Sequence, residues 1–463
     1  MTETPLPASA SPASASPATA SRATGPLTGH VTIPGDKSIS HRALMLAALA
    51  TGTSRLRGLL EGDDVLATAA AMQACGAGIE RSEDGDWQVT GCGPQGLRAP
   101  SAALDFGNSG TGARLAMGLL AGSGVEAVFT GDASLSARPM GRIMSPLSEM
   151  GVGFTSEEGG RLPVTMSPPV PLMPVDLTPE VASAQVKSAI LLAGLGAPGT
   201  TIVREQHITR DHSENMLRLF GAQIERAMDG AQHVVTLHGP ARLRACDMDI
   251  PGDPSSAAFP MVAALIVPGS DVVLENVMLN KQRDGLIRVL RDMGGQIEFL
   301  NPRQQAGEAI ADLHVRHSAL TGIDVPAELA PSMIDEYPIL AMAAACAQGT
   351  MKMNGLAELR VKETDRLAAV ADGLAANGVR FEAGADWLSV TGGPVPGEAV
   401  PGGGLVETRH DHRIAMAFLT LGLAAQAPVK IDDSAMIATS FPAFFELMAS
   451  LGAHFTHDAS GLV

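Results

Sequence analysis

One pattern of helix and strand signals recurs six times along the chain, at intervals of 70 to 81 residues. Each copy opens on small or polar residues and an apolar Ala/Leu/Met helix, and then predicts a β-branched strand, a second helix, a Gly-rich stop and a short strand. The openings lie at 38–40, 108–111, 182–185, 253–256, 334–336 and 411–413, and the closing segments lie at 76–80, 151–154, 221–225, 294–298, 377–382 and 452–455. Such a unit is too long for an ordinary helical solenoid and contains both helical and strand periods, so it predicts repeated α/β structure.

The tetrapeptide Ile-Pro-Gly-Asp occurs at 33–36 and again at 250–253, just before the first and fourth copies. It divides the six copies into two sets of three, so we predict an α/β fold of two similar domains with three βαβ-containing repeats each. We expect the first domain at 36–249, the second at 27–35 together with 250–463, and the hinge near the two tetrapeptides. Chance similarity among Ala/Gly-rich segments is the alternative, but it does not explain six copies in order.

The first 26 residues differ from the rest because Ala, Ser, Pro and Thr dominate them. Such a segment cannot bury a core, so we expect residues 1–26 to form a disordered tail. The segment contains a single arginine, Arg22, and it lacks the basic start and apolar stretch of a secretory signal.

The composition excludes several classes of function. The 463 residues are 45% apolar and 17% charged, and no uncharged apolar run reaches the length of a membrane span. A net charge of −17 with 3% aromatic residues argues against a nucleic-acid partner. The four cysteines are widely spaced without a CxxC pair, which fits a reducing compartment better than a disulfide framework or a zinc ribbon. We therefore expect a cytoplasmic globular protein with neither a nucleic-acid nor a membrane partner.

Basic residues gather where the predicted helices begin. Helix starts present unpaired N–H groups and the positive end of the helix dipole, so several starts facing one cleft would attract an anion. The basic residues at or near these starts are Lys37, Arg42, Arg114, Lys187 and Arg413, and further basic clusters lie at 136–142, 209–216 and 359–366. At any single start the alternative is a plain cap, such as Asp36 or Ser38, with solvated charges around it. The recurrence favours an anion site between the domains.

Two acidic residues accompany these basic groups. Lys362, Glu363 and Arg366 occupy positions i, i+1 and i+4 at a predicted helix start, so Lys362 and Arg366 would share a helix face. Asp335 opens an otherwise nearly uncharged apolar helix. The plain alternatives are a surface ion network for the first group and a helix cap for Asp335, whereas in an anion-binding cleft both carboxylates could transfer protons.

Two segments match known binding motifs, but their sequence context argues against that function. The segment 91–96 matches the dinucleotide-binding pattern GxGxxG, but it contains Pro94 and opens no helix, so we interpret it as a loop. His410, Asp411 and His412 resemble metal ligands but have no further ligand cluster in sequence, and a helix cap followed by an anion-binding Arg413 explains them better.

Taken in order, the motifs resemble the 5-enolpyruvylshikimate-3-phosphate (EPSP) synthases over residues 27 to about 460. The matching segments are PGDKSISHR, DFGNSGTGARL, GDASLSARPMGR, ASAQVKSA, TRDH, PSMIDEYPI, LRVKETDRL, DHRIAMAF and ATSFPAFF. They are most similar to the second bacterial class of this family. The resemblance implies two inside-out α/β barrel domains of three repeats each, joined by a two-strand hinge, in agreement with the repeat count.

The resemblance also implies an activity, the transfer of the enolpyruvyl group of phosphoenolpyruvate (PEP) to the 5-hydroxyl of shikimate 3-phosphate with release of phosphate. No metal or organic cofactor is expected. The implied contacts to shikimate 3-phosphate come from Lys37, Ser38, Arg42, Ser183, Ala184, Gln185, Arg210, Asp335 and Lys362. The implied contacts to PEP come from Lys37, Asn108, Gly110, Arg138, Gln185, Glu363, Arg366 and Arg413. Arginine suits both ligands because its planar fork binds carboxylate and phosphate bidentately.

The same resemblance implies that Asp335, Glu363 and Lys37 are catalytic. Asp335 would act as the base toward the attacking hydroxyl, and Glu363 would deliver and remove the proton at the methylene carbon of PEP. Charge would build and collapse through a tetrahedral intermediate that preorganised cations stabilise as the domains close. The expected partners are the two substrates and the inhibitor glyphosate, which occupies the PEP subsite in this family. We expect a monomer.

One family feature has no counterpart here. Many members have a lysine two residues before the Phe-Pro pair near the C-terminus, whereas Thr439 and Ser440 precede Phe441 in this chain.

Two rival interpretations remain to be compared. The related enolpyruvyl transferase that acts on UDP-N-acetylglucosamine has a loop cysteine where this chain has Ala133. A non-catalytic anion-binding module would not need both Asp335 and Glu363.

Overall fold

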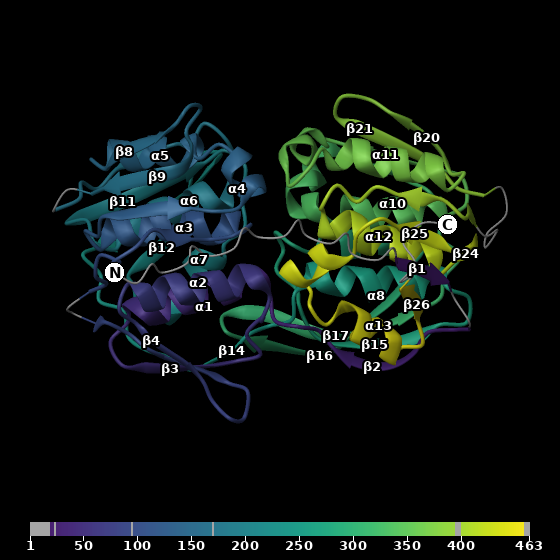
Figure 1. Ribbon diagram of the computed structural model, residues 1–463, viewed down its shortest axis with the longest axis horizontal. Coiled ribbons are helices and arrows are strands. Elements are labelled where there is room, and N and C mark those ends of the chain that lie inside the picture. Colours follow the sequence, from purple (N-terminus) through teal and green to yellow (C-terminus); the bar gives the residue numbers. More distant parts are fainter. Residues whose placement is uncertain (1–18, 23–24, 94–95, 169–170, 394–399, 458–463) are drawn as a thin grey trace, which may run out of the picture.

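The computed structural model describes residues 19–22, 25–93, 96–168, 171–393 and 400–457. Two lobes lie side by side in Figure 1. We call residues 36–249 the first half, and residues 19–35 with 250–457 the second half. Within the described residues, no helix is long and apolar enough to cross a membrane.

Six four-stranded sheets, three in each half, contain most strands of the described chain. In spatial order, those of the first half are β14 (Met248–Asp249), β3 (Thr53–Arg57), β5 (Trp87–Thr90) and β4 (Gly78–Arg81); β6 (Leu104–Asp105), β7 (Ala127–Thr130), β9 (Arg161–Ser167) and β8 (Gly153–Glu157); and β10 (Asp176–Leu177), β11 (Gly199–Glu205), β13 (Gln232–Gly239) and β12 (Ile224–Asp229). Those of the second half are β2 (Thr28–Thr32), β15 (Asp271–Met278), β17 (Glu308–Arg316) and β16 (Gln296–Gln305); β18 (Asp324–Val325), β19 (Thr350–Asn354), β21 (Trp387–Thr391) and β20 (Arg380–Ala383); and β23 (Leu405–Val406), β25 (Val429–Ile431), β1 (Thr19–Arg22) and β26 (His454–His457). A small sheet pairs β22 (Val400–Gly402) with β24 (Ala425–Ala427). There is thus one four-stranded sheet for each predicted repeat.

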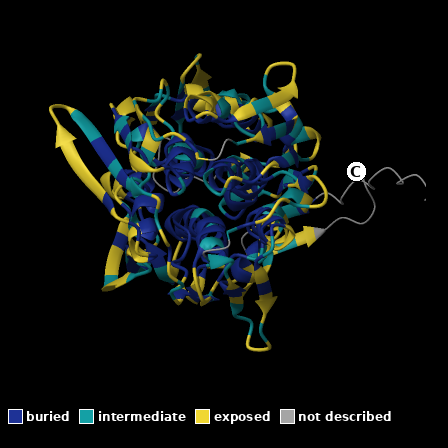
Figure 2. Ribbon diagram, turned by 90° about the vertical axis from the view of Figure 1, so that its left-hand side faces the viewer, coloured by how far each residue is buried: buried dark blue, intermediate teal, exposed yellow. Residues whose placement is uncertain are grey.

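The first helix of each repeat lies inside these sheets, whereas the second helices also carry exposed residues. The first helices of the six repeats are α1 (Lys37–Leu49), α3 (Gly110–Gly122), α6 (Ala184–Gly194), α8 (Pro254–Ile266), α10 (Tyr337–Ala345) and α12 (His412–Gly422). The second helices are α2 (Asp63–Ala74), α5 (Gly141–Glu149), α7 (His212–Leu219), α9 (Gly285–Asp292), α11 (Arg366–Ala376) and α13 (Phe444–Ser450). Shorter elements are α4 (Ala133–Ala137), η2 (Ala327–Ser332), η3 (Ile334–Glu336), η4 (Ala357–Val361) and η5 (Ala435–Thr439). Figure 2 shows dark blue, buried helices in the interior and yellow, exposed positions on the strands around them.

Apolar sequence on all sides of a helix explains this inside-out arrangement, because such a helix is stable only when it is fully buried. Every residue of α8 and of α10 is buried. Close packing also needs small residues: a Cβ atom at Gly118 of α3 would lie 2.3 Å from the carbonyl oxygen of Ala189 in α6. The buried apolar side chains form two large clusters, one within the second half and one within the first half that also includes Ile250, Met278 and Ile310 of the second. The predicted fold class is confirmed.

The predicted disordered tail is wrong for the four residues of β1. Thr19–Arg22 pairs antiparallel with both β25 and β26. In each of the other five sheets, the strand at this place forms a hairpin with the edge strand of the same repeat. The described part of the sixth repeat supplies only the edge strand β26, and β1 takes the place beside it. Ser21 lies against α12 at Gly422, where a side chain would collide with it, so small residues are needed on both elements. Residues 1–18 and 23–24 lie outside the described residues.

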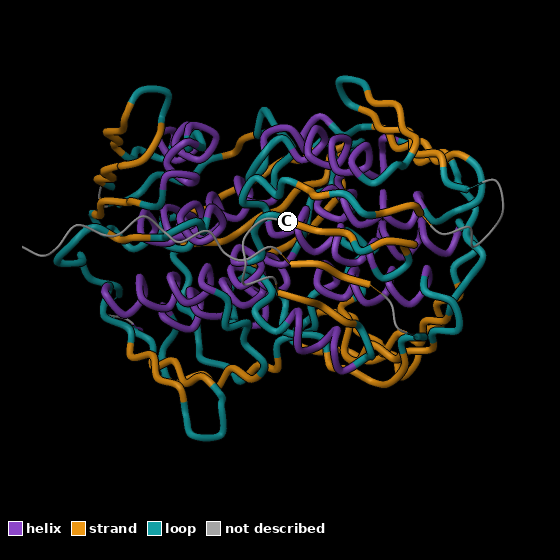
Figure 3. The backbone as a smooth tube through the Cα atoms, turned by 45° about the vertical axis from the view of Figure 1, so that its right-hand side comes forward, coloured by secondary structure: helices purple, strands orange, loops and turns teal. Residues whose placement is uncertain are grey.

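The two Ile-Pro-Gly-Asp segments lie next to each other between the halves. Gly35 pairs with Gly252, the N–H of Asp36 donates to the carbonyl of Pro251 (2.7 Å), and the N–H of Asp253 donates to that of Pro34 (2.9 Å). Arg283 is buried between the carboxylates of Asp36 (3.3 Å) and Asp253 (3.1 Å). In Figure 3 the purple helices of both halves run toward this central region.

Candidate active site

A cavity of about 1110 Å³ lies between the two halves and receives the starts of the inner helices. Several starts are closed by side-chain caps, which leave the other N–H groups of the first turn available. The capping oxygens belong to Asp36 in α1, Ser109 in α3, Ser183 in α6, Asp253 in α8 and Asp411 in α12. A capped helix start can thus still offer N–H groups to an anion, although the sequence analysis treated capping and anion binding as alternatives.

Most of the predicted site residues line this cavity. They are Lys37, Ser38, Asn108, Gly110, Arg138, Ser183, Ala184, Gln185, Arg210, Asp335, Lys362, Glu363, Arg366 and Arg413. Residues separated by more than three hundred positions in the sequence thus share one surface.

Arg42 does not line the cavity. It is buried behind the wall, where it donates to the hydroxyls of Ser213 (2.8 Å) and Ser188 (2.8 Å) and to the carbonyl of Ser38 (2.9 Å). Burial lowers the pKa of Arg42 to about 10. These three hydrogen bonds inside the first half hold the first turn of α1 in place, and a direct contact of Arg42 with a ligand stays a prediction.

Lys187 also turns away from the cavity. Its ammonium lies between the buried carboxylates of Glu205 (2.9 Å) and Glu214 (2.7 Å) and donates to the carbonyl of Thr209 (3.3 Å). Glu205 in turn accepts from the N–H of Thr209 (3.2 Å). Lys187 therefore fixes the loop that carries Arg210 and is not itself an anion ligand.

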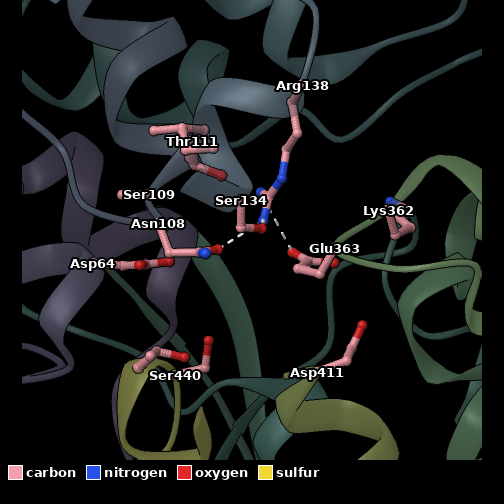
Figure 4. Close-up of polar contacts among 12 residues, drawn as sticks. Asp64, Asn108, Ser109, Thr111, Ser134, Arg138, Lys362, Glu363, Asp411 and Ser440 are labelled. Atoms are coloured by element: carbon pink, nitrogen blue, oxygen red, sulfur yellow. Dashed lines mark hydrogen bonds and ion pairs between the residues drawn. The ribbon is translucent and has the colours of Figure 1, made fainter. Parts of the chain in front are cut away.

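A polar cluster on the first half surrounds the start of α3. Arg138 donates to Asn108 (2.7 Å) and to Ser134 (3.0 Å), and it faces Glu363 of the second half at 3.9 Å (Figure 4). Arg114 donates to Gln185 (3.1 Å), and burial together with the charge of Arg138 lowers the pKa of Arg114 to about 10. Two guanidinium groups held this close together are suited to an anion with more than one charge.

Asp335 lies at the centre of the cations of the second half. Its carboxylate contacts Lys362 (3.1 Å) and Arg366 (3.1 Å), and across the cavity it contacts Arg210 of the first half (2.9 Å). Its carbonyl accepts from Arg413 (3.1 Å). Burial would raise the pKa of Asp335, but the four surrounding cations outweigh burial and hold this pKa well below 3.8. Asp335 is therefore ionised, and it is no helix cap, since no side chain caps α10.

Glu363 lies nearby in a similar environment. It pairs with Arg366, a buried residue that Asp411 holds from behind at 2.7 Å. Burial alone would raise the pKa of Glu363, and the charges of Arg366 and other neighbouring cations lower it instead. The predicted helix face is wrong: α11 begins at Arg366 after its cap Asp365, so Lys362 and Glu363 lie in the preceding loop. The ion network is real, but it lines the cavity instead of covering an outer surface.

The histidines of 410–412 give no sign of a metal site. Asp411 caps α12 and holds Arg366, while His410 pairs with Asp433 at 3.4 Å. A different group, Asp211, His212 and Glu308, has ligand atoms close together between the halves. Its carboxylates already accept from His212 itself and from Asn215, Asn280 and Arg226, so each of their four oxygens has a protein donor.

The family model of EPSP synthase (3-phosphoshikimate 1-carboxyvinyltransferase) matches residues 21–448. The chain belongs to the EPSP synthase family. A 3-phosphoshikimate 1-carboxyvinyltransferase of Methylorubrum extorquens is 58% identical over 440 residues, which cover 94% of this chain and 96% of that relative. One from Methylobacterium sp. (strain 4-46) is 59% identical over 434 residues, with 93% and 96% covered. Among solved structures, an EPSP synthase from Acinetobacter baumannii has a TM-score of 0.85 and 43% identity and covers 95% of this chain and 100% of its own.

In this EPSP synthase family member, the polar residues of the cavity wall that the sequence analysis did not assign to the site include Asp64, Thr111, Arg283 and Ser440. Thr111 accepts from Gln185 (3.0 Å) at the start of α3, and its place in the motif DFGNSGTGARL could have indicated it. Asp64 and Ser440 contact the same lysine, Lys37, from opposite halves. No sequence period links positions so far apart, so no signal could have paired them.

Proposed function

We propose that this chain transfers the enolpyruvyl group of PEP to the 5-hydroxyl of shikimate 3-phosphate and releases phosphate. Family membership supports the reaction class, since the relatives bear the name 3-phosphoshikimate 1-carboxyvinyltransferase. The observation that carries the proposal is one ionised carboxylate, Asp335, held among Arg210, Lys362 and Arg366 in a cavity that Arg138 and Arg413 also line. Such a cavity can bind two anions and still offer a base.

The two substrates divide this cavity between them in the proposed complex. Shikimate 3-phosphate is held by one group of residues, with Arg42 supporting Ser38 from behind: Ser38, Ser183, Ala184, Arg210, Asp335 and Lys362. PEP is held by a second group: Asn108, Gly110, Arg138, Glu363, Arg366 and Arg413. Lys37 and Gln185 lie between the two substrates.

The proposed chemistry is an addition followed by an elimination. Asp335 takes the proton of the 5-hydroxyl while that oxygen forms a bond to the second carbon of PEP, and Glu363 delivers a proton to the methylene carbon. From the resulting tetrahedral intermediate the phosphate leaves, and Glu363 removes a proton from the new methyl group. The arginines stabilise the intermediate because they are already oriented before charge develops.

Glu363 must be protonated to act as the acid, although its pKa is lowered in the free protein. The carboxylate and phosphate of PEP would neutralise Arg138 and Arg366, which are among the groups that lower this pKa. Binding of PEP should therefore raise the pKa of Glu363, and burial then works in the same direction. Binding of PEP would thus favour the protonated form of Glu363, which the proton transfer requires.

The domain division expected from the sequence, with a hinge near 33–36 and 250–253, supports a cycle of opening and closing. We further propose that the protein works as a cytoplasmic monomer and that glyphosate inhibits it by occupying the PEP subsite. The geometry that supports this cycle is the set of contacts across the cavity, such as Arg210 with Asp335 and Arg138 with Glu363.

Phosphate release is the direct test of this function. Purified protein should release phosphate from PEP only when shikimate 3-phosphate is present. Replacing shikimate 3-phosphate with UDP-N-acetylglucosamine tests for the activity of the related transferase. If neither acceptor leads to phosphate release, the non-catalytic anion-binding module is supported instead. Phosphate release from PEP with UDP-N-acetylglucosamine but not with shikimate 3-phosphate would refute the proposal.

A further inference from the structure

Lys37 is held by two residues that the sequence motifs do not connect with it. Its ammonium forms an ion pair with Asp64 at the start of α2, and it donates a hydrogen bond of 2.7 Å to the hydroxyl of Ser440, just after η5. All three side chains line the cavity. Figure 4 shows Asp64 and Ser440 on one side of the site, opposite Glu363 and Lys362.

Ser440 reaches Lys37 because its loop docks on the first half. A Cβ atom at Gly62, the residue before α2, would lie 2.8 Å from the carbonyl oxygen of Thr439, so the two backbones are in direct contact. The hydroxyl of Thr439 is engaged elsewhere, since it donates to the carbonyl of Met436 in its own turn (2.7 Å). Of the two neighbouring hydroxyls, therefore, only that of Ser440 is directed at Lys37.

The number of donors shows what this arrangement leaves for a ligand. An ammonium group has three N–H donors. Asp64 and Ser440 occupy two of them, which leaves one donor of Lys37 for an anion in the cavity. A lysine side chain has four rotatable bonds, and fixing it costs conformational entropy. Two partners that fix the ammonium before a ligand arrives remove that cost from binding.

We propose that Asp64 and Ser440 are positioning residues that direct the free donor of Lys37 toward the substrates. Ser440 has the further role of linking the position of Lys37 to the contact between the halves, because it belongs to the second half and Lys37 to the first. The proposal thereby gives a role to the segment that lacks the lysine found in many family members. It rests on the proposed function for its kinetic test, and a binding test without turnover keeps the two separable.

The test compares Ser440→Ala with its matched control Thr439→Ala. Ser440→Ala should lower kcat/KM for PEP about tenfold, the size expected for one hydrogen bond to a charged group. Thr439→Ala removes the adjacent hydroxyl, which does not reach Lys37, and should change kcat/KM less than about twofold. Ser440→Thr keeps a hydroxyl and should recover most of the loss. Melting temperatures of all variants would separate this effect from unfolding.

A double-mutant cycle makes the test specific. In a Lys37→Met background, Ser440→Ala should have almost no further effect, because the group that it positions is gone. Calorimetric binding of inorganic phosphate, which needs no turnover, should weaken about tenfold for Ser440→Ala and not for Thr439→Ala. A loss of equal size in the Lys37→Met background, or unchanged phosphate affinity and kcat/KM for Ser440→Ala, would overturn the proposal. If the parent protein bound phosphate with this pattern but released none from PEP, the proposed reaction would fail and the positioning role would stand.

Discussion

Gly110→Ala is the substitution that most directly tests where PEP and glyphosate bind. Gly110 is the first residue of α3 and lines the cavity. An added methyl group would lie 2.9 Å from Nη1 of Arg114, 3.3 Å from Nη1 of Arg138 and 3.5 Å from Leu135. Two of these atoms are the ends of flexible side chains, so the chain can fold with alanine, but both guanidinium groups must move. Both groups border the proposed PEP subsite.

The cost can be estimated from the tightness of this site. Arg138 cannot move freely, because Asn108 and Ser134 hold it at 2.7 and 3.0 Å. Overpacking a tight site costs about 1–3 kcal/mol, which corresponds to inhibition by glyphosate that is weaker by about five- to 150-fold. PEP is shorter than glyphosate, so its KM should rise by a smaller factor. The parent protein, with glycine at this position, should be inhibited more strongly than the alanine variant.

The assay is phosphate release at several concentrations of PEP and glyphosate, which gives the KM and the inhibition constant of each form. Gly141→Ala is a matched control, because Gly141 begins α5 and a Cβ atom there meets nothing within 4 Å. The control should leave both constants unchanged. Equal inhibition of the parent and Gly110→Ala would show that Gly110 does not border the inhibitor and that the assignment of the PEP subsite is wrong.

Three further predictions concern the carboxylates, the closure of the halves and the N-terminal strand. Asp335→Asn should lower turnover about 10²- to 10⁴-fold in the phosphate assay with little change in KM. Because the pKa of Asp335 is depressed, its ion pairs stabilise the fold above about pH 4. The difference in melting temperature between the parent and the variant should therefore shrink as the pH falls below 3.8. Small-angle scattering should give a smaller radius of gyration with shikimate 3-phosphate and glyphosate than without them, and an unchanged radius would mean that the free protein is already closed. Removal of residues 1–22 should lower the melting temperature below that of a chain that lacks only residues 1–18, because the sixth sheet loses β1; equal values for the two truncated chains would contradict a stabilising role for β1.

The sequence carried the repeat architecture because that information is local. Each inner helix needs a polar start and an apolar body, and these features recur at a readable spacing. Side-chain direction and the pairing of a distant strand are not local, and two basic residues and β1 show the difference. Arg42 and Lys187 stand near helix starts as Lys37 does, yet the first is held by buried hydroxyls and the second by buried carboxylates. β1 was missed because its low apolar content predicts disorder in isolation, and only the sixth sheet supplies its partners.

Contacts across the cavity explain why a chain of net charge −17 can keep so many cations in one place. Asp335 and Glu363 neutralise Arg210, Lys362, Arg366 and Arg138, and these pairs include groups from both halves. A bound phosphate or carboxylate of a ligand would form ion pairs with these cations in place of Asp335 and Glu363. The carboxylates would then lose the charges that hold their pKa values down, and they would gain basicity where a proton must be moved. In the proposed mechanism, these ion pairs thus hold the pKa values of Asp335 and Glu363 low until the substrates bind.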